Sequence, residues 1–135
     1  LAGHVAGLEH LGQAPAEVFD GGYTYADGAR IAETLLAKGD ALPDGFLCPN
    51  DLFAIGLMDR LRAVAGLRFP EDMKVVGFDD IPMAEWESND LTTIRLPVQA
   101  MAKRATDVIS RIVLEDETVE EKIWIPCRLI ERRSA

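Results

Sequence analysis

Two adjacent carboxylates, Asp79 and Asp80, follow an apolar run that is typical of a buried strand. Residues 74–78 read Lys-Val-Val-Gly-Phe, and β-forming residues without polar alternation favour a strand covered on both faces, as in a parallel sheet flanked by helices. Ligands of such sheets bind beyond the carboxyl ends of the strands. An ionised carboxylate accepts hydrogen bonds from hydroxyls, so Asp79 is a candidate for holding a small polar molecule. The alternative is a turn residue that accepts main-chain N–H groups.

Strand and helix signals alternate along the chain, which is typical of an α/β domain with a mostly parallel sheet. Thr24 and Asp27 have the spacing of a capping box, and Asn50 is a favoured residue at a helix N-terminus. Apolar residues recur at helical spacing from Val98 to Val113, so one face of that helix needs cover. The sequence predicts helices at residues 1–11, 24–39, 50–65 and 97–114, strands at 17–19, 45–48, 75–76, 91–96, 123–125 and 128–130, and an irregular loop or short helix at 81–90.

Length, charge and cysteine content limit the classes of protein to consider. The chain has 135 residues, enough for one domain with a real core. Its net charge of −9 argues against nucleic-acid binding by this part of the protein, because phosphate contacts require clustered Lys and Arg. Cys48 and Cys127 are too far apart in sequence for a disulfide framework or a zinc site, which favours reduced thiols in a cytoplasmic protein. We see no secretory signal or membrane-spanning run, and a start at Leu1 within a predicted helix indicates a piece of a longer protein.

Several segments together resemble the effector-binding core of bacterial transcription regulators of the lactose and galactose repressor (LacI/GalR) family. They occur in the family's order and at its separations, and they cover nearly the whole chain. The segments are residues 46–56 (FLCPNDLFAIG), 66–72 (GLRFPED), 75–82 (VVGFDDIP), 91–94 (LTTI) and 129–134 (LIERRS).

The resemblance implies a three-layer α/β lobe with a parallel sheet, of the periplasmic-binding-protein-like (type I) fold, plus one helix that belongs to the other lobe. In the family, an N-terminal helix-turn-helix head precedes two lobes that hold the effector between them. Residues 1–90 would form the C-terminal effector-binding lobe, residues 91–118 the crossover strand and helix of the N-terminal lobe, and residues 119–135 the return to the C-terminal lobe. The DNA-binding head and most of the N-terminal lobe would be absent from this chain.

The resemblance assigns three residues to the effector. Asp79 matches a carboxylate that accepts from effector hydroxyls, Asn50 matches an amide that offers a donor and an acceptor, and Tyr23 matches an aromatic residue that stacks on the effector ring. Asn50 could instead be only a helix cap, and Tyr23 an ordinary surface residue. Asp80 is expected to be structural, and Asp51 to lie in the first turn of its helix, where its charge suits the helix dipole.

A second set of residues is assigned to a homodimer contact. Leu52 and Ile55 are expected to project from the helix after Asn50 on the side opposite its core face, and exposed apolar pairs can mark subunit contacts. Family dimers join through this helix and through the loop that holds Met83 and Trp86. Burial of Trp86 in the core is the alternative.

The implied function is the effector-sensing and dimerisation region of a DNA-binding transcription regulator, expected to be a repressor. A sugar-like effector is favoured over a purine, DNA would be contacted only through the absent head, and no membrane contact, cofactor or metal is expected. A periplasmic-type sugar-binding protein of a transport system shares the fold and is the closest rival. A Mg²⁺-dependent phosphoryl-transfer enzyme or receiver domain is less favoured, because the sequence lacks a Gly-rich phosphate loop and a histidine near the paired acids. We therefore expect no enzyme activity.

Overall fold

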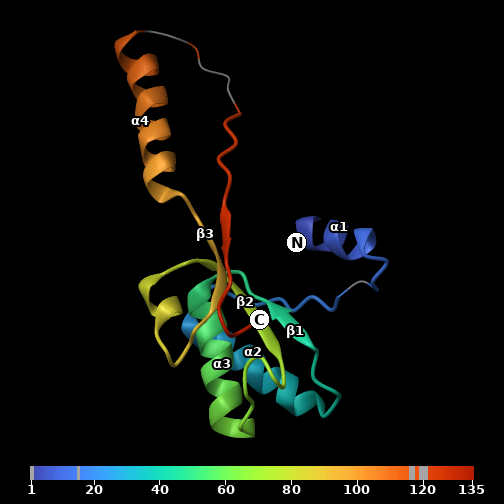
Figure 1. The fold of residues 1–135 in the computed structure, drawn as a ribbon. Coiled ribbons are helices and arrows are strands. Elements are labelled where there is room, and N and C mark those ends of the chain that lie inside the picture. Colours follow the sequence, from blue (N-terminus) through green and yellow to red (C-terminus); the bar gives the residue numbers. More distant parts are fainter. Residues whose placement is uncertain (1, 15, 116–117, 119–121) are drawn as a thin grey trace.

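We describe the chain from a computed structural model, which places residues 2–14, 16–115, 118 and 122–135. Figure 1 shows a small sheet with helices beside it and one helix projecting away. The alternation of helices and strands agrees with the α/β pattern expected from the sequence. In chain order the elements are α1 (Ala2–His10), α2 (Tyr25–Lys38), β1 (Gly45–Leu47), α3 (Asp51–Ala65), β2 (Lys74–Asp79), the 3₁₀ helix η1 (Pro82–Glu85), β3 (Thr92–Arg95), α4 (Val98–Leu114) and β4 (Arg128–Ile130).

The strands form one mixed sheet in the order β1-β2-β3-β4. Both β1 and β3 run parallel to β2, whereas β4 runs antiparallel to β3. Leu47 of β1 is the register partner of Val76, and Asp79 at the end of β2 is the partner of Arg95. The carboxyl ends of the three parallel strands therefore meet at one edge, where ligands of such sheets bind.

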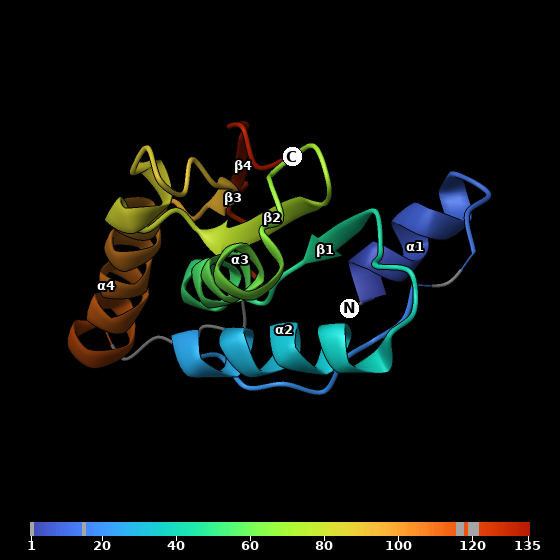
Figure 2. The ribbon, with the colours of Figure 1, turned by 90° about the horizontal axis from the view of Figure 1, so that it is seen from below.

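Helices α2 and α3 pack against each other and cover one face of the sheet (Figures 1 and 2). Two glycines bring the helices close together. A Cβ atom on Gly28 would lie 2.0 Å from the carbonyl oxygen of Phe53, and a Cβ atom on Gly56 would lie 2.0 Å from that of Tyr25. Since these neighbours are backbone atoms, a larger residue at either glycine would force the helices apart. The core that they close includes Ile31, Ala32, Leu35, Phe53, Leu57, Met58, Leu61, Met73 and Val75.

The helix ends follow the chemistry read from the sequence. Thr24 Oγ1 accepts from the Asp27 N–H, and the Asp27 carboxylate accepts from the Thr24 N–H, which confirms the capping box. Asn50 caps α3. Gly39 and Gly66 end α2 and α3 with φ angles of 69° and 66°, a left-handed conformation that glycine adopts without steric cost.

Two predicted strands are wrong. Residues 17–19 are not a strand, because side-chain contacts rather than ladder hydrogen bonds hold them in place. The ring centroids of Phe19 and Phe46 of β1 lie 5.7 Å apart, and Glu17 pairs with Lys38 at the end of α2. Residues 123–125 are not a strand either. β4 pairs only with residues 93–95, and β3 cannot extend further because Pro97 lacks an N–H and α4 follows directly.

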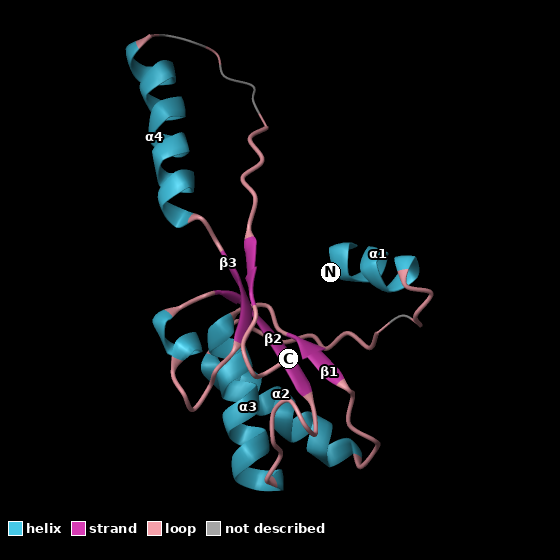
Figure 3. Ribbon diagram, in the orientation of Figure 1, coloured by secondary structure: helices cyan, strands magenta, loops and turns pink. Residues whose placement is uncertain are grey.

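Helices α1 and α4 lie outside the packed core, and neither contains a buried residue. α4 projects away from the sheet at the end of β3, and the chain returns to β4 from the same direction (Figures 1 and 3). No helix of the part described here is long and apolar enough to cross a membrane. Large apolar side chains are exposed along α4, namely Val98, Met101, Ile109, Ile112, Val113 and Leu114.

Candidate functional site

Asn50 and Asp79 lie at the same edge of the sheet. They follow the paired residues Leu47 and Val76 at equal separation along two parallel neighbouring strands. Asp79 is thus the last residue of β2, and Asn50 lies just beyond the carboxyl end of β1.

The Asn50 side chain connects α3 to the segment before α2. Its Oδ1 accepts from the Phe53 N–H at 2.8 Å, and its Nδ2 donates to the Tyr23 carbonyl oxygen at 2.8 Å. The amide therefore acts as a helix cap, yet one lone pair and one N–H remain for another partner. The Tyr23 side chain is 69% exposed, so its ring is open to solvent.

Asp79 begins a turn in which two successive residues have positive φ. The φ angle is 114° at Asp79 and 58° at Asp80, values that residues other than glycine adopt rarely. The Asp79 side chain is partly exposed, and no described residue forms a hydrogen bond or ion pair with it. Its carboxylate is thus available to a hydroxyl donor, unlike that of the neighbouring Asp80.

Asp80 joins the end of β2 to β3 and to the segment that follows β4. Its side chain is 5% exposed, its Oδ1 lies 2.8 Å from Arg132 Nη2, and its Oδ2 pairs with Arg95 Nε. Burial alone would raise the pKa of Asp80, but the hydrogen bonds and charges of the two arginines outweigh it and hold the pKa below its ordinary value. The geometry agrees with the structural role expected for Asp80.

Asp51 is a residue whose role the sequence reasoning missed. It lies in the first turn of α3 as expected, but it is also fully buried beneath the turn. Its Oδ1 accepts from Thr93 Oγ1 at 2.5 Å, and its Oδ2 accepts from the Ile81 N–H at 2.9 Å. Burial raises the pKa of Asp51, and its hydrogen bonds oppose that rise. The available signal was Gly77, since glycine inside a strand often marks the close approach of another group.

The three predicted effector residues do not line one enclosed pocket. A half-open groove of about 930 Å³ is lined by Tyr23, Phe46 and Phe53, and by His4 and Leu8 of α1. Within the described part of the chain, its lining includes neither Asn50 nor Asp79. The structure thus links Asn50 to Tyr23 by a hydrogen bond, and it places Asp79 at the same sheet edge but outside the groove.

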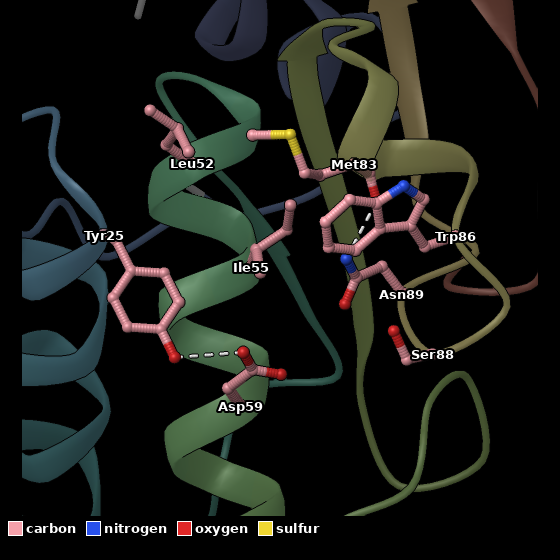
Figure 4. A pocket seen from close by; sticks show the side chains of 8 residues that line it. All are labelled: Tyr25, Leu52, Ile55, Asp59, Met83, Trp86, Ser88 and Asn89. Atoms are coloured by element: carbon pink, nitrogen blue, oxygen red, sulfur yellow. Dashed lines mark hydrogen bonds between the residues drawn. The ribbon is translucent and has the colours of Figure 1, made fainter.

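The four residues assigned to a dimer contact do come together. Leu52, Ile55, Met83 and Trp86 line one cavity of about 250 Å³ between α3 and the η1 loop (Figure 4). Leu52 is 41% exposed and Trp86 is 57% exposed, so Trp86 is not a core residue. The expectation that Ile55 is exposed is wrong: it is 7% exposed and lies beside the loop that carries Met83 and Trp86.

Polar contacts fix the walls of this cavity. The Tyr25 hydroxyl donates to Asp59 Oδ2 at 3.0 Å, which ties α2 to α3. Asn89 Nδ2 donates to the Met83 carbonyl oxygen at 2.8 Å and so holds the loop on the other wall (Figure 4). Hydrogen bonds therefore hold both walls of the cavity, α3 on one side and the η1 loop on the other.

Metal-binding and disulfide chemistry have little support in the described residues. No cluster of three or more His, Cys, Asp or Glu residues among them could hold a metal ion. Cys48 is buried and Cys127 is exposed, and both are free. Burial raises the pKa of the Cys48 thiol, with the Asp51 charge adding to the effect, so this thiol is held in its protonated form.

The mixed, mostly parallel sheet, the shared edge at the carboxyl ends of its strands and the crossover to a projecting helix are features of a periplasmic-binding-protein-like α/β domain. Residues 3–135 match the periplasmic binding protein-like domain family. The chain belongs to this family, and its relatives identify it as an effector-domain segment of the LacI/GalR regulator type. The expected fold class is confirmed.

The relatives are transcription regulators rather than enzymes. The HTH-type transcriptional repressor PurR of Vibrio cholerae serotype O1 is 34% identical over 106 residues, which cover 78% of this chain and 31% of that protein. A LacI-type transcription regulator from Bifidobacterium animalis subsp. lactis has a TM-score of 0.88 at 30% identity, covering 98% of this chain and 48% of that one. The regulator CelR in complex with cellobiose has a TM-score of 0.89 at 27% identity, covering 98% and 41%. The chain thus spans about a third of the length of the PurR relative.

Proposed function

We propose that this chain is the effector-sensing and dimerisation region of a DNA-binding transcriptional repressor, and that its effector is a sugar-like molecule. The observation that carries the proposal is the Asp79 carboxylate, which lies at the ligand edge of the sheet and is unpaired among the described residues. A polyol supplies several hydroxyl donors, and each hydrogen bond to an ionised carboxylate contributes about 1.5–3 kcal/mol. CelR, which was solved with cellobiose, supports a sugar as the first class to test.

Asn50 and Tyr23 complete the proposed effector site. Asn50 keeps one donor and one acceptor after capping α3, which suits a ring hydroxyl that both donates and accepts. The exposed Tyr23 ring offers an apolar face on which a sugar ring can stack. Together the three residues would grip one side of an effector.

A second lobe would supply the other side of the site. We assign residues 1–90 and 119–135 to the C-terminal lobe, and residues 91–118 to the crossover strand and helix of the N-terminal lobe. Within this crossover, β3 still pairs with β2 of the C-terminal sheet, so α4 is the part that would pack in the second lobe. α4 suits this division because it buries no residue and projects from the end of β3 (Figure 1). Effector binding between lobes would then change their orientation, and a regulator would transmit that change to its DNA-binding heads by a population shift. Such a protein acts in the cytoplasm.

The dimer contact would be the cavity lined by Leu52, Ile55, Met83 and Trp86. Two of these side chains are large, apolar and exposed, and a homodimer with twofold symmetry would bury the same surface on both subunits. An aromatic side chain at such a contact is typical of protein interfaces.

Asp79→Asn in the complete gene product tests the effector site. Cellobiose, ribose and hypoxanthine are titrated calorimetrically into the wild-type protein and the variant. We expect wild-type binding of a sugar, and about tenfold or greater loss of affinity in the variant because a charged acceptor is replaced by a neutral amide. The control is Glu71→Gln, an exposed acid that precedes β2 at the opposite end of the strand from Asp79 and should leave the affinity unchanged. Equal affinities in Asp79→Asn and wild type would overturn the proposed site.

The gene upstream of Leu1 separates the regulator from its rival. A helix-turn-helix segment at the start of the open reading frame is the expected result. An export signal there would favour a sugar-binding protein of a transport system instead, and it would rule out the repressor proposal.

A further inference from the structure

Asp51 connects three segments that meet beneath the effector edge. It is the first residue of α3, its Oδ2 accepts from the Ile81 N–H at 2.9 Å, and its Oδ1 accepts from Thr93 Oγ1 of β3 at 2.5 Å. The side chain is 0% exposed. The carboxylate therefore holds the segment that follows Asp79 and Asp80 from the interior of the lobe.

The fold leaves a space in β2 for this carboxylate. A Cβ atom on Gly77 would lie 2.2 Å from Asp51 Oδ1, so only glycine admits the side chain at this place. Gly77 precedes Asp79 by one intervening residue, and the turn with positive φ follows at once. The buried contact is thus made directly under the residues that shape the turn.

A buried carboxylate at position 51 costs folding free energy. A buried carboxylate loses its hydration, and only its hydrogen bonds offset that loss. The titratable groups that interact with it are the carboxylate of Asp79, at the end of β2, and the thiol of Cys48, after β1, and neither supplies a positive charge. An amide would avoid the repulsion from Asp79, but it would present N–H groups to main-chain donors. In the observed arrangement both oxygens accept, one from the Ile81 N–H and one from the Thr93 hydroxyl, and an amide would keep only one of these acceptors.

We propose that Asp51 is a positioning residue of the effector site, whose buried carboxylate fixes the turn that presents Asp79. This inference rests on the proposed role of Asp79 as an effector ligand. Asp51 acts through the main chain after β2 and does not itself touch the effector. Without it, the turn keeps the arginine pairs of Asp80 but loses its buried contact with α3, and the Asp79 carboxylate loses its fixed direction.

Amide hydrogen exchange of the 135-residue chain tests whether Asp51 fixes the turn. In Asp51→Ala, exchange at the Ile81 amide should become about tenfold faster or more, because its buried acceptor is gone. Asp51→Asn keeps one acceptor oxygen and should fall between wild type and Asp51→Ala. If the alanine variant does not fold, exchange at the Ile81 amide in Asp51→Asn is compared with wild type instead.

Ser134→Ala is the matched control for loss of a buried polar side chain. Ser134 is 1% exposed, and its hydroxyl donates to the Val75 carbonyl oxygen and accepts from the Thr92 N–H, at the other end of β2 from the turn. This variant should lower stability without faster exchange at Ile81. Faster exchange at Ile81 in Ser134→Ala by as much as in Asp51→Ala would overturn the inference, since a general loss of stability would then explain both.

Binding by the complete gene product separates this inference from the proposed function. With cellobiose as the probe, Asp51→Ala should bind about tenfold more weakly than Ser134→Ala, and Asp51→Asn should recover part of the affinity. If Asp51→Ala binds cellobiose as tightly as wild type although exchange at Ile81 is faster, the positioning role is overturned. The proposed effector function would not be affected by that result. If the wild-type protein binds neither sugar nor hypoxanthine, the proposed function is overturned. The exchange rate at the Ile81 amide separately shows whether Asp51 fixes the turn.

Discussion

Asp51 Oδ1 occupies the space in which a side chain at position 77 would lie, only 2.2 Å from where a Cβ atom on Gly77 would stand. The first residue of α3 thereby reaches the backbone of β2 without an intervening side chain. Sheet, helix and turn are joined at one buried carboxylate.

Gly77→Ala should destabilise the fold by about 2–4 kcal/mol, because the added methyl group must displace either the buried Asp51 carboxylate or the strand. Chemical denaturation monitored by tryptophan fluorescence measures the free energy of unfolding. Gly3→Ala in α1 is the control, since nothing lies within 4 Å of its Cβ position and alanine favours a helix. Equal effects of the two substitutions would contradict the close approach at Gly77.

Arg132→Ala should destabilise the protein by about 3 kcal/mol, because it removes the main partner of a buried carboxylate. Arg132 is 12% exposed in its side chain, pairs with Asp80 and also donates to the Leu91 carbonyl oxygen. The adjacent Arg133 is the natural control: its side chain is 71% exposed and pairs with Asp90, so Arg133→Ala should cost less than about 1 kcal/mol. Similar losses in the two variants would contradict the ranking by burial.

The contribution of Asp80 should depend on pH in a defined direction. Its folded-state pKa is held below the ordinary value by Arg132 and Arg95 in spite of burial, so the ionised form stabilises the fold above about pH 4 and that stability is lost as the pH falls further. The difference in unfolding free energy between wild type and Asp80→Asn should therefore shrink at low pH. Ser134→Ala, which changes no titrating group, should show a constant difference. A constant difference for Asp80→Asn would argue against the paired carboxylate.

Leu52→Asp should weaken the proposed dimer, because it places a charge in the cavity that also contains Trp86. Sedimentation velocity of the complete gene product should show a shift toward monomer. Val64→Asp provides the control, since Val64 lies on the same helix, is 54% exposed and does not line the cavity. Loss of the dimer in both variants, or in neither, would contradict the assigned contact.

The 135-residue chain alone should self-associate through α4. Its exposed apolar residues include Ile109 at 59% and Val113 at 71% exposure, and an uncovered apolar helix face favours association. The double substitution Ile109→Lys and Val113→Lys should lower the sedimentation coefficient at a given concentration, whereas Leu52→Asp should not abolish association. A compact monomer for the unmodified chain would refute this expectation.

Local chemistry made most of the fold predictable. The capping box at Thr24, the cap at Asn50 and the glycine ends of α2 and α3 depend on residues close in sequence, and all four are present. The strands expected at residues 17–19 and 123–125 failed for a non-local reason. A β-forming sequence becomes a strand only if a distant segment is aligned with it for hydrogen bonding, and nothing in the segment itself encodes that alignment.

The candidate site was predictable in part. The positions of Asn50 and Asp79 at one sheet edge follow from parallel pairing, which the strand pattern indicated. The burial of Asp51 and Ile55 did not follow, because each depends on a segment distant in sequence, the β2 strand in one case and the η1 loop in the other. A helical pattern shows which side of α3 is apolar, but it does not show what a later loop will cover.

α2 and α3 come into contact at Gly28 and Gly56, so the short distance between the two helices depends on the absence of a side chain at these two positions. Tyr23 and Asn50 lie just before the starts of these helices, so the contact between the helices also sets the distance between these two residues. A library that randomises Tyr23 and its exposed neighbours could therefore change which effector is bound while the packing of α2 against α3 stays the same. In natural relatives, substitutions at exposed positions such as Tyr23 could likewise change the effector, whereas substitutions at Gly28 or Gly56 would disturb the packing of α2 against α3.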